Sequence, residues 1–573
     1  MIYHIALCLT RRVANGDNPR MRTQCPFVLL LPVLLHAAAA AQDRSSREWL
    51  TWGGDAERSG WHRGDTAISR RNAPSLELKW KLQIDREVPV EIRSGNSMLS
   101  APLVAEGIKT GRGTETLVYT LSAAHQLTAI NAATGKISWQ RMLTPKKPAP
   151  RPANWICTNM QTATPVIDKT AGILYAVSAD GVLYGVSLPD GEDRFPPTDF
   201  VTPYSRNWSL NLVGGVLYTS VGRGCGSTEA ETVASHMIAI DIQDPRRPIR
   251  KLVTSVGKPS GAWGRGGLAW GPKGIYAQTG DGTFEPETGK WGNVLLALDP
   301  KTLEVRDYFA PPNLEMLNSK DLDFGSASPL TFAHQGRQYV LSGGKDGTIF
   351  ILDANSLGGT DHRTPLFAQR IGNDENSYAA AGIWGAMTTA VDAKGKRWVY
   401  VPMWGPVSKE VTGFAHTHGE TKDGSIMAFR FAVQGGKPAL IPAWVSRTLA
   451  VPEPPVFANG VVFALSTGEN TQQRTTAPLR PGEAPPLSMG SGRAGKKSSG
   501  PRVRILSPQE RVENVTHATL YAFDAFTGEE LYSSKDAIDD WTHLSSIALG
   551  AGKVYVTTSR SWIFAFGPKS GQN

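Results

Sequence analysis

Four residues in the middle of the chain carry side chains that can do chemistry. Trp263 lies eighteen residues before Asp281, Asp323 follows forty-two residues later, and Lys345 comes next. Carboxylates offer oxygen ligands to hard cations and accept protons, and an indole offers a flat apolar face. Each residue also has an ordinary interpretation, because a tryptophan can pack between sheets and Gly-Asp-Gly, Asp-x-Asp-Phe-Gly and Lys-Asp-Gly are good turn sequences. Their joint spacing makes the set a candidate site.

Other chemistry-bearing motifs are weaker. His416 and His418, in Phe-Ala-His-Thr-His-Gly, suggest a metal, but two histidines without a third ligand are typical of a loop. The sequence contains no Gly-x-Ser-x-Gly motif, so it gives no sign of a hydrolase with a nucleophile elbow. The sequence has no CxxC pair and no CxxCH motif, so we expect neither a zinc ribbon nor a covalently bound haem.

The first 41 residues have the pattern of an export signal. Arg20-Met21-Arg22 precedes an apolar run, residues 26–35, and small residues follow at 37–41. The apolar run is far shorter than the ~20 residues that a membrane-spanning helix needs. Met21 is an alternative start. We therefore expect a leader, residues 1–41, and a mature chain, residues 42–573, that is periplasmic or secreted and has no membrane span.

The charge of the chain does not indicate a nucleic-acid partner. The formal net charge is +9, and the leader contributes four arginines against one aspartate, or +3, which leaves +6 for the mature chain. Such a mild excess, spread over more than 500 residues, is typical of ordinary solubility.

A repeated unit accounts for most of the mature chain. Each copy joins a strand ending in a turn, a Val/Leu-Tyr strand, a glycine-containing hairpin, and an apolar strand that closes on Asp or Asn before a Thr-Gly turn; residues 127–139 and 520–528 are the clearest copies. This size is typical of a four-stranded propeller blade. We expect seven blades near residues 97–143, 156–201, 207–256, 260–311, 321–371, 379–446 and 450–538.

Strands from both ends of the chain complete an eighth blade. Residues 541–567 contain three strands, and residues 78–82 form an unpaired strand that can supply the fourth. Closing the ring removes an exposed sheet edge. In each Thr-Gly turn the glycine is free to take a positive φ, and a terminal tryptophan can dock on the neighbouring blade. The predicted fold is an all-β, eight-bladed β-propeller of four-stranded antiparallel blades, forming a single domain.

One segment breaks the repeat. Residues 471–515 are rich in Pro, Gly, Ser, Arg and Lys and interrupt the seventh blade between Leu465 and Leu520. This composition predicts a disordered surface loop. The two cysteines of the mature chain, Cys157 and Cys225, fall at axis-facing positions of neighbouring blades, and we hypothesise a disulfide between them.

The repeat carries a family resemblance. Ala-x-Asn-x-x-Thr-Gly-x-x-x-Trp, complete at residues 129–139, resembles the repeat signature of the quinoprotein dehydrogenases, the PQQ-like or quinoprotein alcohol dehydrogenase-like family. Trp52-Gly53-Gly54-Asp55, together with residues 75–80, is similar to their N-terminal segment. In catalytic members, pyrroloquinoline quinone (PQQ) lies near the propeller axis, stacked on a tryptophan, and calcium bridges it to acidic and amide side chains.

The resemblance implies roles for individual residues. Trp263 resembles the stacking tryptophan, and Asp281 stands where the family usually has an asparagine calcium ligand. Asp323 matches the catalytic aspartate, which accepts the alcohol proton, and the resemblance implies that Asp281 and Asp323 bind the metal. Lys345 resembles the basic residue that contacts the quinone, and Trp384 matches a further aromatic residue at the site. The implied function is a PQQ- and calcium-dependent alcohol dehydrogenase acting on a small alcohol or a polymer.

The sequence also departs from the family pattern. The adjacent-cysteine ring is absent because Cys157 is followed by Thr158, Leu99 and Ile383 replace polar residues, and the calcium-binding glutamate expected near residue 224 has no close match. Each lost charged hydrogen bond weakens cofactor binding by about 1.5–3 kcal/mol. Many proteins with this repeat bind no quinone. The alternative hypothesis is therefore a cofactor-free scaffold that binds a protein or a polysaccharide through loops around the central funnel.

Overall fold

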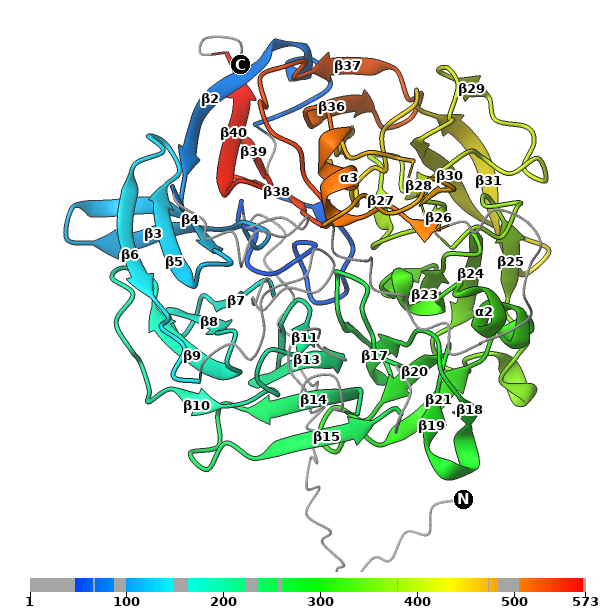
Figure 1. The fold of residues 1–573 in the computed structure, drawn as a ribbon, viewed down its shortest axis with the longest axis horizontal. Helices are drawn as coiled ribbons and strands as arrows, with labels where there is room; N and C mark the ends of the chain where they lie inside the picture. Colours follow the sequence, from blue (N-terminus) through cyan, green and yellow to red (C-terminus); the bar gives the residue numbers. More distant parts are fainter. Residues whose placement is uncertain are drawn as a thin grey trace, which may run out of the picture. The chain divides into compact units, whose positions relative to one another are not determined.

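The computed structural model describes residues 47–64, 67–86, 99–147, 163–222, 234–255, 260–378, 380–472, 474–482 and 504–569. The chain divides into a unit Met1–Ala40, which lies outside these residues, and a compact unit Ala41–Asn573. Within the compact unit, small antiparallel sheets follow one another around a common axis in chain order (Figure 1). None of the helices in the described ranges is long and apolar enough to cross a membrane.

The first four blades follow the predicted ranges closely. They consist of β3 (Leu103–Thr110), β4 (Gly113–Leu121), β5 (Gln126–Asn131) and β6 (Ile137–Met142); β7 (Val166–Asp168), β8 (Ile173–Val177), β9 (Val182–Ser187) and β10 (Thr198–Asp199); β11 (Arg206–Asn207), β12 (Asn211–Val213), β13 (Val216–Gly222), β14 (His236–Asp241) and β15 (Ile249–Val253); and β16 (Ala269–Gly271), β17 (Gly274–Gln278), β20 (Leu295–Leu298) and β21 (Val305–Phe309).

The other four blades complete the ring. They consist of β22 (Leu330–His334), β23 (Arg337–Gly343), β24 (Thr348–Asp353) and β25 (Phe367–Arg370); β26 (Gly382–Ile383), β27 (Thr388–Val391), β28 (Arg397–Trp404), β30 (Gly424–Gln434) and β31 (Lys437–Val445), joined by β29 (His416–Thr417); β32 (Val456–Ala458), β33 (Val461–Ser466), β36 (Thr519–Asp524) and β37 (Glu530–Ser533), joined by β1 (Trp61–His62); and β38 (Ile547–Gly550), β39 (Lys553–Thr557), β40 (Trp562–Pro568) and β2 (Leu76–Gln83).

Several short elements lie outside the eight main sheets. They are the hairpin β18 (Phe284–Glu285) and β19 (Lys290–Trp291), the pair β34 (Arg474–Thr475) and β35 (Arg504–Ile505), the α-helices α2 (Leu314–Lys320) and α3 (Pro508–Glu513), and the 3₁₀ turns η1 (Ala73–Ser75), η3 (Pro286–Thr288), η4 (Phe324–Ser326) and η5 (Gly359–Asp361).

The eighth blade closes the ring as predicted. Strand β2 pairs antiparallel with β40, with Leu78 opposite Phe566 and Leu82 opposite Ile563, so strands from the two ends of the chain share one sheet (Figure 1). This pairing satisfies backbone groups that would otherwise form an open edge. The eight-bladed β-propeller predicted from the repeat is therefore confirmed.

Tryptophans of one blade pack against glycine-containing turns of the next blade: two Thr-Gly turns, at Gly135 and Gly528, and one Asp-Gly turn, at Gly191. Trp139 on β6 donates its Nε1 hydrogen to the carbonyl of Leu188 at 2.9 Å, and its ring covers Gly191 of the next blade. The same arrangement is found twice more. Trp80 covers Gly135 and donates its Nε1 hydrogen to the carbonyl of Ala132 at 3.0 Å. Trp444 covers Gly528 and donates to the carbonyl of Ala525 at 2.9 Å. The three glycines have φ values of +77°, +70° and +76°, which explains why glycine is needed there. The predicted tryptophan docking is thus found at three blade junctions.

The N-terminal segment, residues 49–62, lies close to the axis and contacts all eight blades (blue in Figure 1). Its hydrogen-bonded partners, blade by blade, are Trp49 with Val104, Leu50 with Ile167, Arg58 with Leu210, Ala56 with Trp270, Glu57 with Thr331, Ser59 with Thr389, Gly60 with Phe457, and Trp52 with Ser546. Because these partners come from the inner parts of the sheets, the segment ties the blades together around the axis.

Arg58 anchors this segment. Its guanidinium is fully buried and donates to the carbonyls of Trp52, Leu210 and Leu268 at 2.9–3.1 Å, and to the hydroxyl of Thr51 at 2.7 Å. Burial lowers the pKa of Arg58 to about 9. A buried charge persists when it is hydrogen-bonded in this way, so Arg58 links the segment to blades three and four.

Two stretches predicted as loops contain regular structure. The edges of the 471–515 insertion form β34, β35 and α3, and α3 begins with a capping box between Ser507 and Glu510. His416 and Thr417 form β29, which pairs in parallel with the end of β31. The centre of the insertion, the leader, and both Cys157 and Cys225 lie outside the described residues, so the proposed disulfide stays a prediction.

Candidate functional site

The five predicted site residues come from loops of blades four, five and six. Trp263 precedes β16, Asp281 follows β17, Asp323 lies between α2 and η4, Lys345 follows β23, and Trp384 follows β26. Loops that lead into and out of inner strands meet near the axis of a propeller, so residues far apart in sequence can meet there. The structure brings all five together in one cluster.

Lys345 joins the acidic and the aromatic halves of this cluster. Its Nζ lies 2.6 Å from Oδ2 of Asp323 and 3.3 Å from Oδ1 of Asp321, and 5.2 and 5.0 Å from the ring centres of Trp263 and Trp384. The side chain is only 1% exposed. Burial by itself lowers the pKa of Lys345, but the neighbouring carboxylates outweigh burial and raise it. Lys345 is therefore a buried, permanently charged ammonium at neutral pH.

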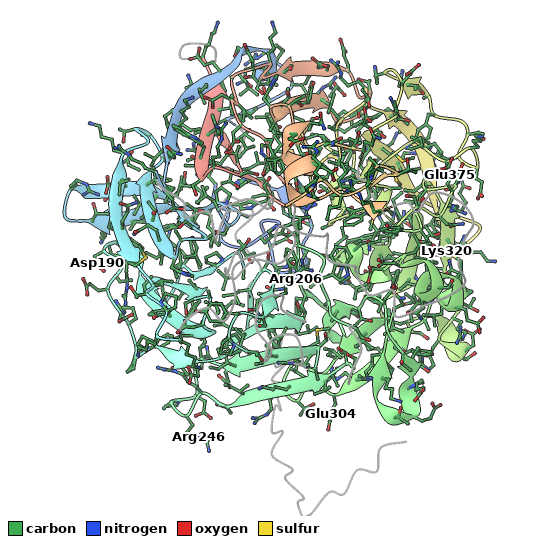
Figure 2. All side chains as sticks on the ribbon, in the orientation of Figure 1. Asp190, Arg206, Arg246, Glu304, Lys320 and Glu375 are labelled. Carbon is green, nitrogen blue, oxygen red and sulfur yellow. The ribbon has the colours of Figure 1, made fainter. Side chains whose placement is uncertain are left out.

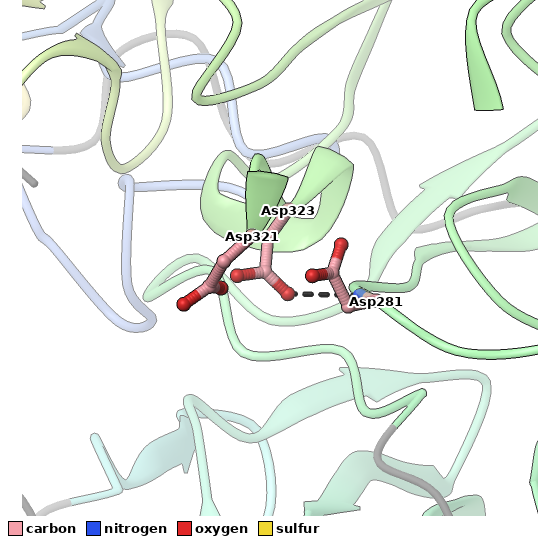
Figure 3. A group of neighbouring side chains, drawn as sticks. All are labelled: Asp281, Asp321 and Asp323. Atoms are coloured by element: carbon pink, nitrogen blue, oxygen red, sulfur yellow. Dashed lines mark hydrogen bonds between the residues drawn. The ribbon is translucent and has the colours of Figure 1, made fainter. Parts of the chain in front are cut away.

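Three carboxylates form a compact acidic group (Figure 3). One oxygen from each of Asp281, Asp321 and Asp323 lies within 4.8 Å of the other two. The backbone N–H of Asp281 donates to Oδ1 of Asp323 at 2.8 Å, and Nδ2 of Asn293 donates to Oδ1 of Asp281 at 2.8 Å. Asp321 takes a left-handed conformation, with φ of 57°, at the end of α2. Such backbone conformations are uncommon for residues other than glycine and tend to occur at functional sites.

Asp321 and Asn293 belong to the site but have no predicted role in the sequence motifs. The signal for Asp321 was present, because two carboxylates two residues apart in Asp321-Leu322-Asp323 can reach one site, but the motif also reads as a turn. Asn293 gave no signal. It is fully buried, and its Oδ1 accepts a hydrogen bond from the backbone N–H of Phe324 at 2.8 Å. Asn293 therefore holds the loops of Asp281 and Asp323 together.

The carboxylates of this group have strongly perturbed pKa values. Burial, and after it the charge of Asp323, raises the pKa of Asp281 to about 8, and burial raises that of Asp321 to about 7. Burial acts in the same direction at Asp323, but the charge and hydrogen bond of Lys345 outweigh it and lower the pKa to about 2. Asp323 is therefore ionised at neutral pH, whereas the other two carboxyl groups exchange protons near neutrality. Clusters of perturbed groups of this kind are typical of functional sites.

Aromatic rings form the other side of the cluster. The ring centres of Trp263 and Trp384 are 5.4 Å apart with an interplanar angle of 67°, and Trp384 stacks on Trp404 at 4.6 Å and 3°. Nε1 of Trp384 donates to the carbonyl of Ala381 at 2.7 Å, which fixes the ring. Trp263 and Trp384 are half-buried. Both predicted tryptophans thus present part of their surface beside Lys345.

The acidic group fits a hard cation. If a bound cation displaced the protons of Asp281 and Asp321, the three carboxylates and the ammonium of Lys345 would carry a formal charge of −2, which a divalent cation would balance. Oxygen ligands are those that calcium prefers, and a bound cation would relieve the repulsion that raises the pKa of Asp281 and Asp321. Trp263 offers a flat face and Lys345 a positive charge to a planar anionic cofactor such as PQQ. The residues present therefore suit both groups.

Arg206 adds a second positive charge near the acidic group. It lies on β11 close to the centre of the ring, whereas Asp190, Arg246 and Glu304 lie near the rim (Figure 2). Burial lowers the pKa of Arg206 to about 10, and the charge of Asp323 opposes this shift. The sequence gave no sign of this residue, because nothing near β11 in the chain resembles a site motif.

A second polar cluster lies on the other side of the stacked tryptophans. Arg265 pairs with Glu453, and Nδ1 of His543 lies 2.5 Å from Oε2 of Glu469. Arg265 also donates to the carbonyl of Trp384 at 3.4 Å. Burial lowers the pKa of Arg265 to about 9, against the charge of Glu469. These partners are 188 and 74 residues apart, so only the tertiary structure could reveal them.

Two described residues that replace polar residues of the quinoprotein pattern, Leu99 and Ile383, make apolar contacts in the interior. Leu99 is 2% exposed and lies in a hydrophobic core cluster shared by blades one, two, seven and eight. Ile383 is fully buried on β26, and its carbonyl accepts a hydrogen bond from Ser326 at 2.7 Å. Neither side chain can donate to a cofactor. Thr158 and the region of residue 224 lie outside the described residues.

Known proteins share this architecture. The family described as "Outer membrane protein assembly factor BamB" matches residues 80–262. The quinohemoprotein alcohol dehydrogenase ADHIIG from Pseudomonas putida HK5 has 12% identity and a TM-score of 0.56, with 92% of this chain and 81% of that chain covered. The quinohemoprotein alcohol dehydrogenase from Comamonas testosteroni has 15% identity and a TM-score of 0.52, with 93% and 82% covered.

A europium-containing methanol dehydrogenase is also similar, at 12% identity and a TM-score of 0.54, with 91% of this chain and 99% of that chain covered. A search of curated proteins gives no match. At these identities the structural similarity concerns the fold alone. The family match over residues 80–262, the repeat and the eight-bladed ring show a PQQ-like β-propeller fold, which the motif at residues 129–139 predicts.

Proposed function

We propose that this protein is a divergent quinoprotein-type alcohol dehydrogenase that uses PQQ and Ca²⁺. The observation that carries the proposal is that Trp263, Asp281, Asp323, Lys345 and Trp384, which the family resemblance singled out, lie in one cluster with perturbed pKa values. A chance set of turn residues and packing tryptophans would have no reason to converge. The similarity to alcohol and methanol dehydrogenases supports the same choice at the level of fold.

In this proposal, Asp281, Asp321 and Asp323 hold the cation, Trp263 supports the cofactor ring, and Lys345 neutralises the cofactor's negative charge. When bound, PQQ supplies the oxidising quinone, and Ca²⁺ supplies a Lewis acid that polarises it. Asp323 accepts the proton of the substrate hydroxyl group. Its carboxylate is already ionised, and contacts from Lys345 to Oδ2 and from the N–H of Asp281 to Oδ1 fix its orientation.

Binding and turnover can be tested separately. PQQ and CaCl₂ are added to the purified protein, binding is followed by tryptophan fluorescence, and oxidation of small alcohols is followed with an artificial dye acceptor. We expect saturable, calcium-dependent binding at micromolar PQQ. Asp321→Asn should weaken calcium binding and retain turnover at high calcium, whereas Asp323→Asn should abolish turnover even at calcium and PQQ concentrations that saturate binding. Absence of saturable binding at micromolar PQQ would end the proposal.

A second candidate is a cofactor-free scaffold that binds a protein or a polysaccharide through loops around the funnel. It is favoured by the apolar side chains of Leu99 and Ile383 and by the match to a family described as an assembly factor. In that case Lys345 and Asp323 serve only to balance charge in the interior. A protein that binds neither PQQ nor calcium but is retained on a polysaccharide or partner column would support this candidate.

We also propose that the protein is exported, because residues 1–41 have the composition of a cleaved signal. N-terminal sequencing of the protein recovered from the periplasm or medium should start at Gln42. An intact leader on the recovered protein would contradict this.

A further inference from the structure

His416 and His418 form an exposed pair far from the axial cluster in sequence. Residues two apart on a strand point to the same side, and both histidines are exposed at strand β29 or directly after it. Their ring centres are 6.3 Å apart, and the ring planes differ by 20°. The two imidazoles therefore stand side by side on the surface.

One of the two rings is held in a defined tautomer. Nε2 of His418 lies 2.7 Å from the carbonyl oxygen of Thr527, in a turn of the seventh blade. A carbonyl oxygen only accepts hydrogen bonds, so Nε2 carries a hydrogen, and in the neutral ring Nδ1 keeps its lone pair. Histidines that bind metals usually donate their other ring N–H to a carbonyl or carboxylate in this way.

The backbone beneath the pair is tied down. The backbone N–H of Ala415 donates to the carbonyl of Ala443, and that of His418 donates to the carbonyl of Val445, both at 3.0 Å. Metal–imidazole bonds of about 2.0–2.1 Å place two ring centres roughly 5 Å apart, so the exposed side chains must rotate to bring the rings closer. Because the backbone is already held in place, binding costs less entropy than it would on a free loop.

We propose that His416 and His418 form a surface site for a divalent transition cation such as Cu²⁺, Ni²⁺ or Zn²⁺, with water in the remaining positions. Imidazole nitrogens suit these metals, with Cu²⁺ bound most tightly, whereas Ca²⁺ and Mg²⁺ prefer oxygen ligands. The site is therefore chemically distinct from the carboxylate group at Asp281, Asp321 and Asp323. Because His418 reaches from blade six to Thr527 of blade seven, a bound metal also strengthens this blade junction.

Titration of the full-length protein, purified without a histidine tag, with Cu²⁺ and Zn²⁺ in a calorimeter tests the site. We expect one micromolar site, tighter for Cu²⁺, that is unaffected by excess Ca²⁺. His416→Gln and His418→Gln should each weaken it at least tenfold. His517→Gln, which changes another exposed histidine, is the matched control and should leave the affinity unchanged.

Electron paramagnetic resonance of the Cu²⁺ complex gives a second measurement. We expect two coordinated nitrogens in the wild-type protein and one in either variant. At a hundredfold excess over the wild-type Kd, Tm should rise by about 2 °C in the wild type and by about 1 °C or less in either variant. Melting curves without metal show whether the variants are folded. Unchanged Cu²⁺ affinity in both folded variants, or a spectrum that does not change between them and the wild type, would overturn the proposal.

Discussion

Replacing Lys345 with methionine removes a buried positive charge but keeps a side chain of similar length. The ammonium is 1% exposed and 2.6 Å from Asp323, so the variant leaves the acidic group without its nearest counter-ion. Removing one partner of a buried ion pair costs about 3–5 kcal/mol. The contact with Asp321 is longer and partly exposed to solvent, which screens its share, so we expect a loss of about 3 kcal/mol.

Thermal melting in the presence of a chelator measures this loss. An unfolding entropy of about 2.1 cal/mol/K per residue makes Tm fall by roughly 1 °C per kcal/mol in a chain of this length, so Lys345→Met should melt about 3 °C lower. The double variant Lys345→Met/Asp323→Asn removes both charges together and should melt about 2 °C higher than the sum of the single losses predicts. Additive losses would refute the reasoning, because they would mean that the two residues do not interact.

Three further predictions concern the framework. Burial raises the pKa of Glu57 from 4.5 to about 7, so the folded protein binds this proton more tightly than the unfolded chain does, and stability falls as pH rises between these values. Glu57→Gln should therefore raise Tm by about 1–2 °C at pH 8 and leave it unchanged at pH 4, whereas equal shifts at both pH values would contradict this cause. Gly528→Ala places a Cβ 2.6 Å from the ring of Trp444 at a φ of +76° and should lower Tm by about 3 °C, whereas Gly436→Ala, at a similar φ with open space around it, should lower it by about 1 °C. Arg58→Met removes the guanidinium's buried hydrogen bonds to carbonyls of two blades and should lower Tm by about 3–5 °C; a fall below 1 °C would show that the axial segment contributes little.

The repeat was predictable from sequence because its signals are local. A closing strand, an Asp or Asn, and a Thr-Gly turn recur within a few residues, and each turn needs a glycine with positive φ, as at Gly135 and Gly528. The pairing of β2 with β40 was also predictable, although the two strands are almost 500 residues apart, because a closed ring leaves one three-stranded sheet and one unpaired strand.

The axial contacts were less predictable. The path of residues 49–62 past all eight blades depends on hydrogen bonds to partners up to 494 residues away, which no local pattern encodes. The same holds for Arg206 and for the pair of Glu469 with His543. The motif that contains Asp321 is typical of both a turn and a binding site. Only the position of Asp321 beside Lys345, which the tertiary structure shows, favours the binding site over the turn.

The sequence by itself determined the blade count, the closing strand, the tryptophan docking, and a short set of candidate residues, because strand periodicity and turn chemistry act over a few residues. Only the tertiary structure decided that Trp263, Asp281, Asp323, Lys345 and Trp384 meet, and that Lys345 is buried against the carboxylates. The energies that set their protonation depend on burial and on distances between loops of different blades. Those quantities exist only once the ring has closed.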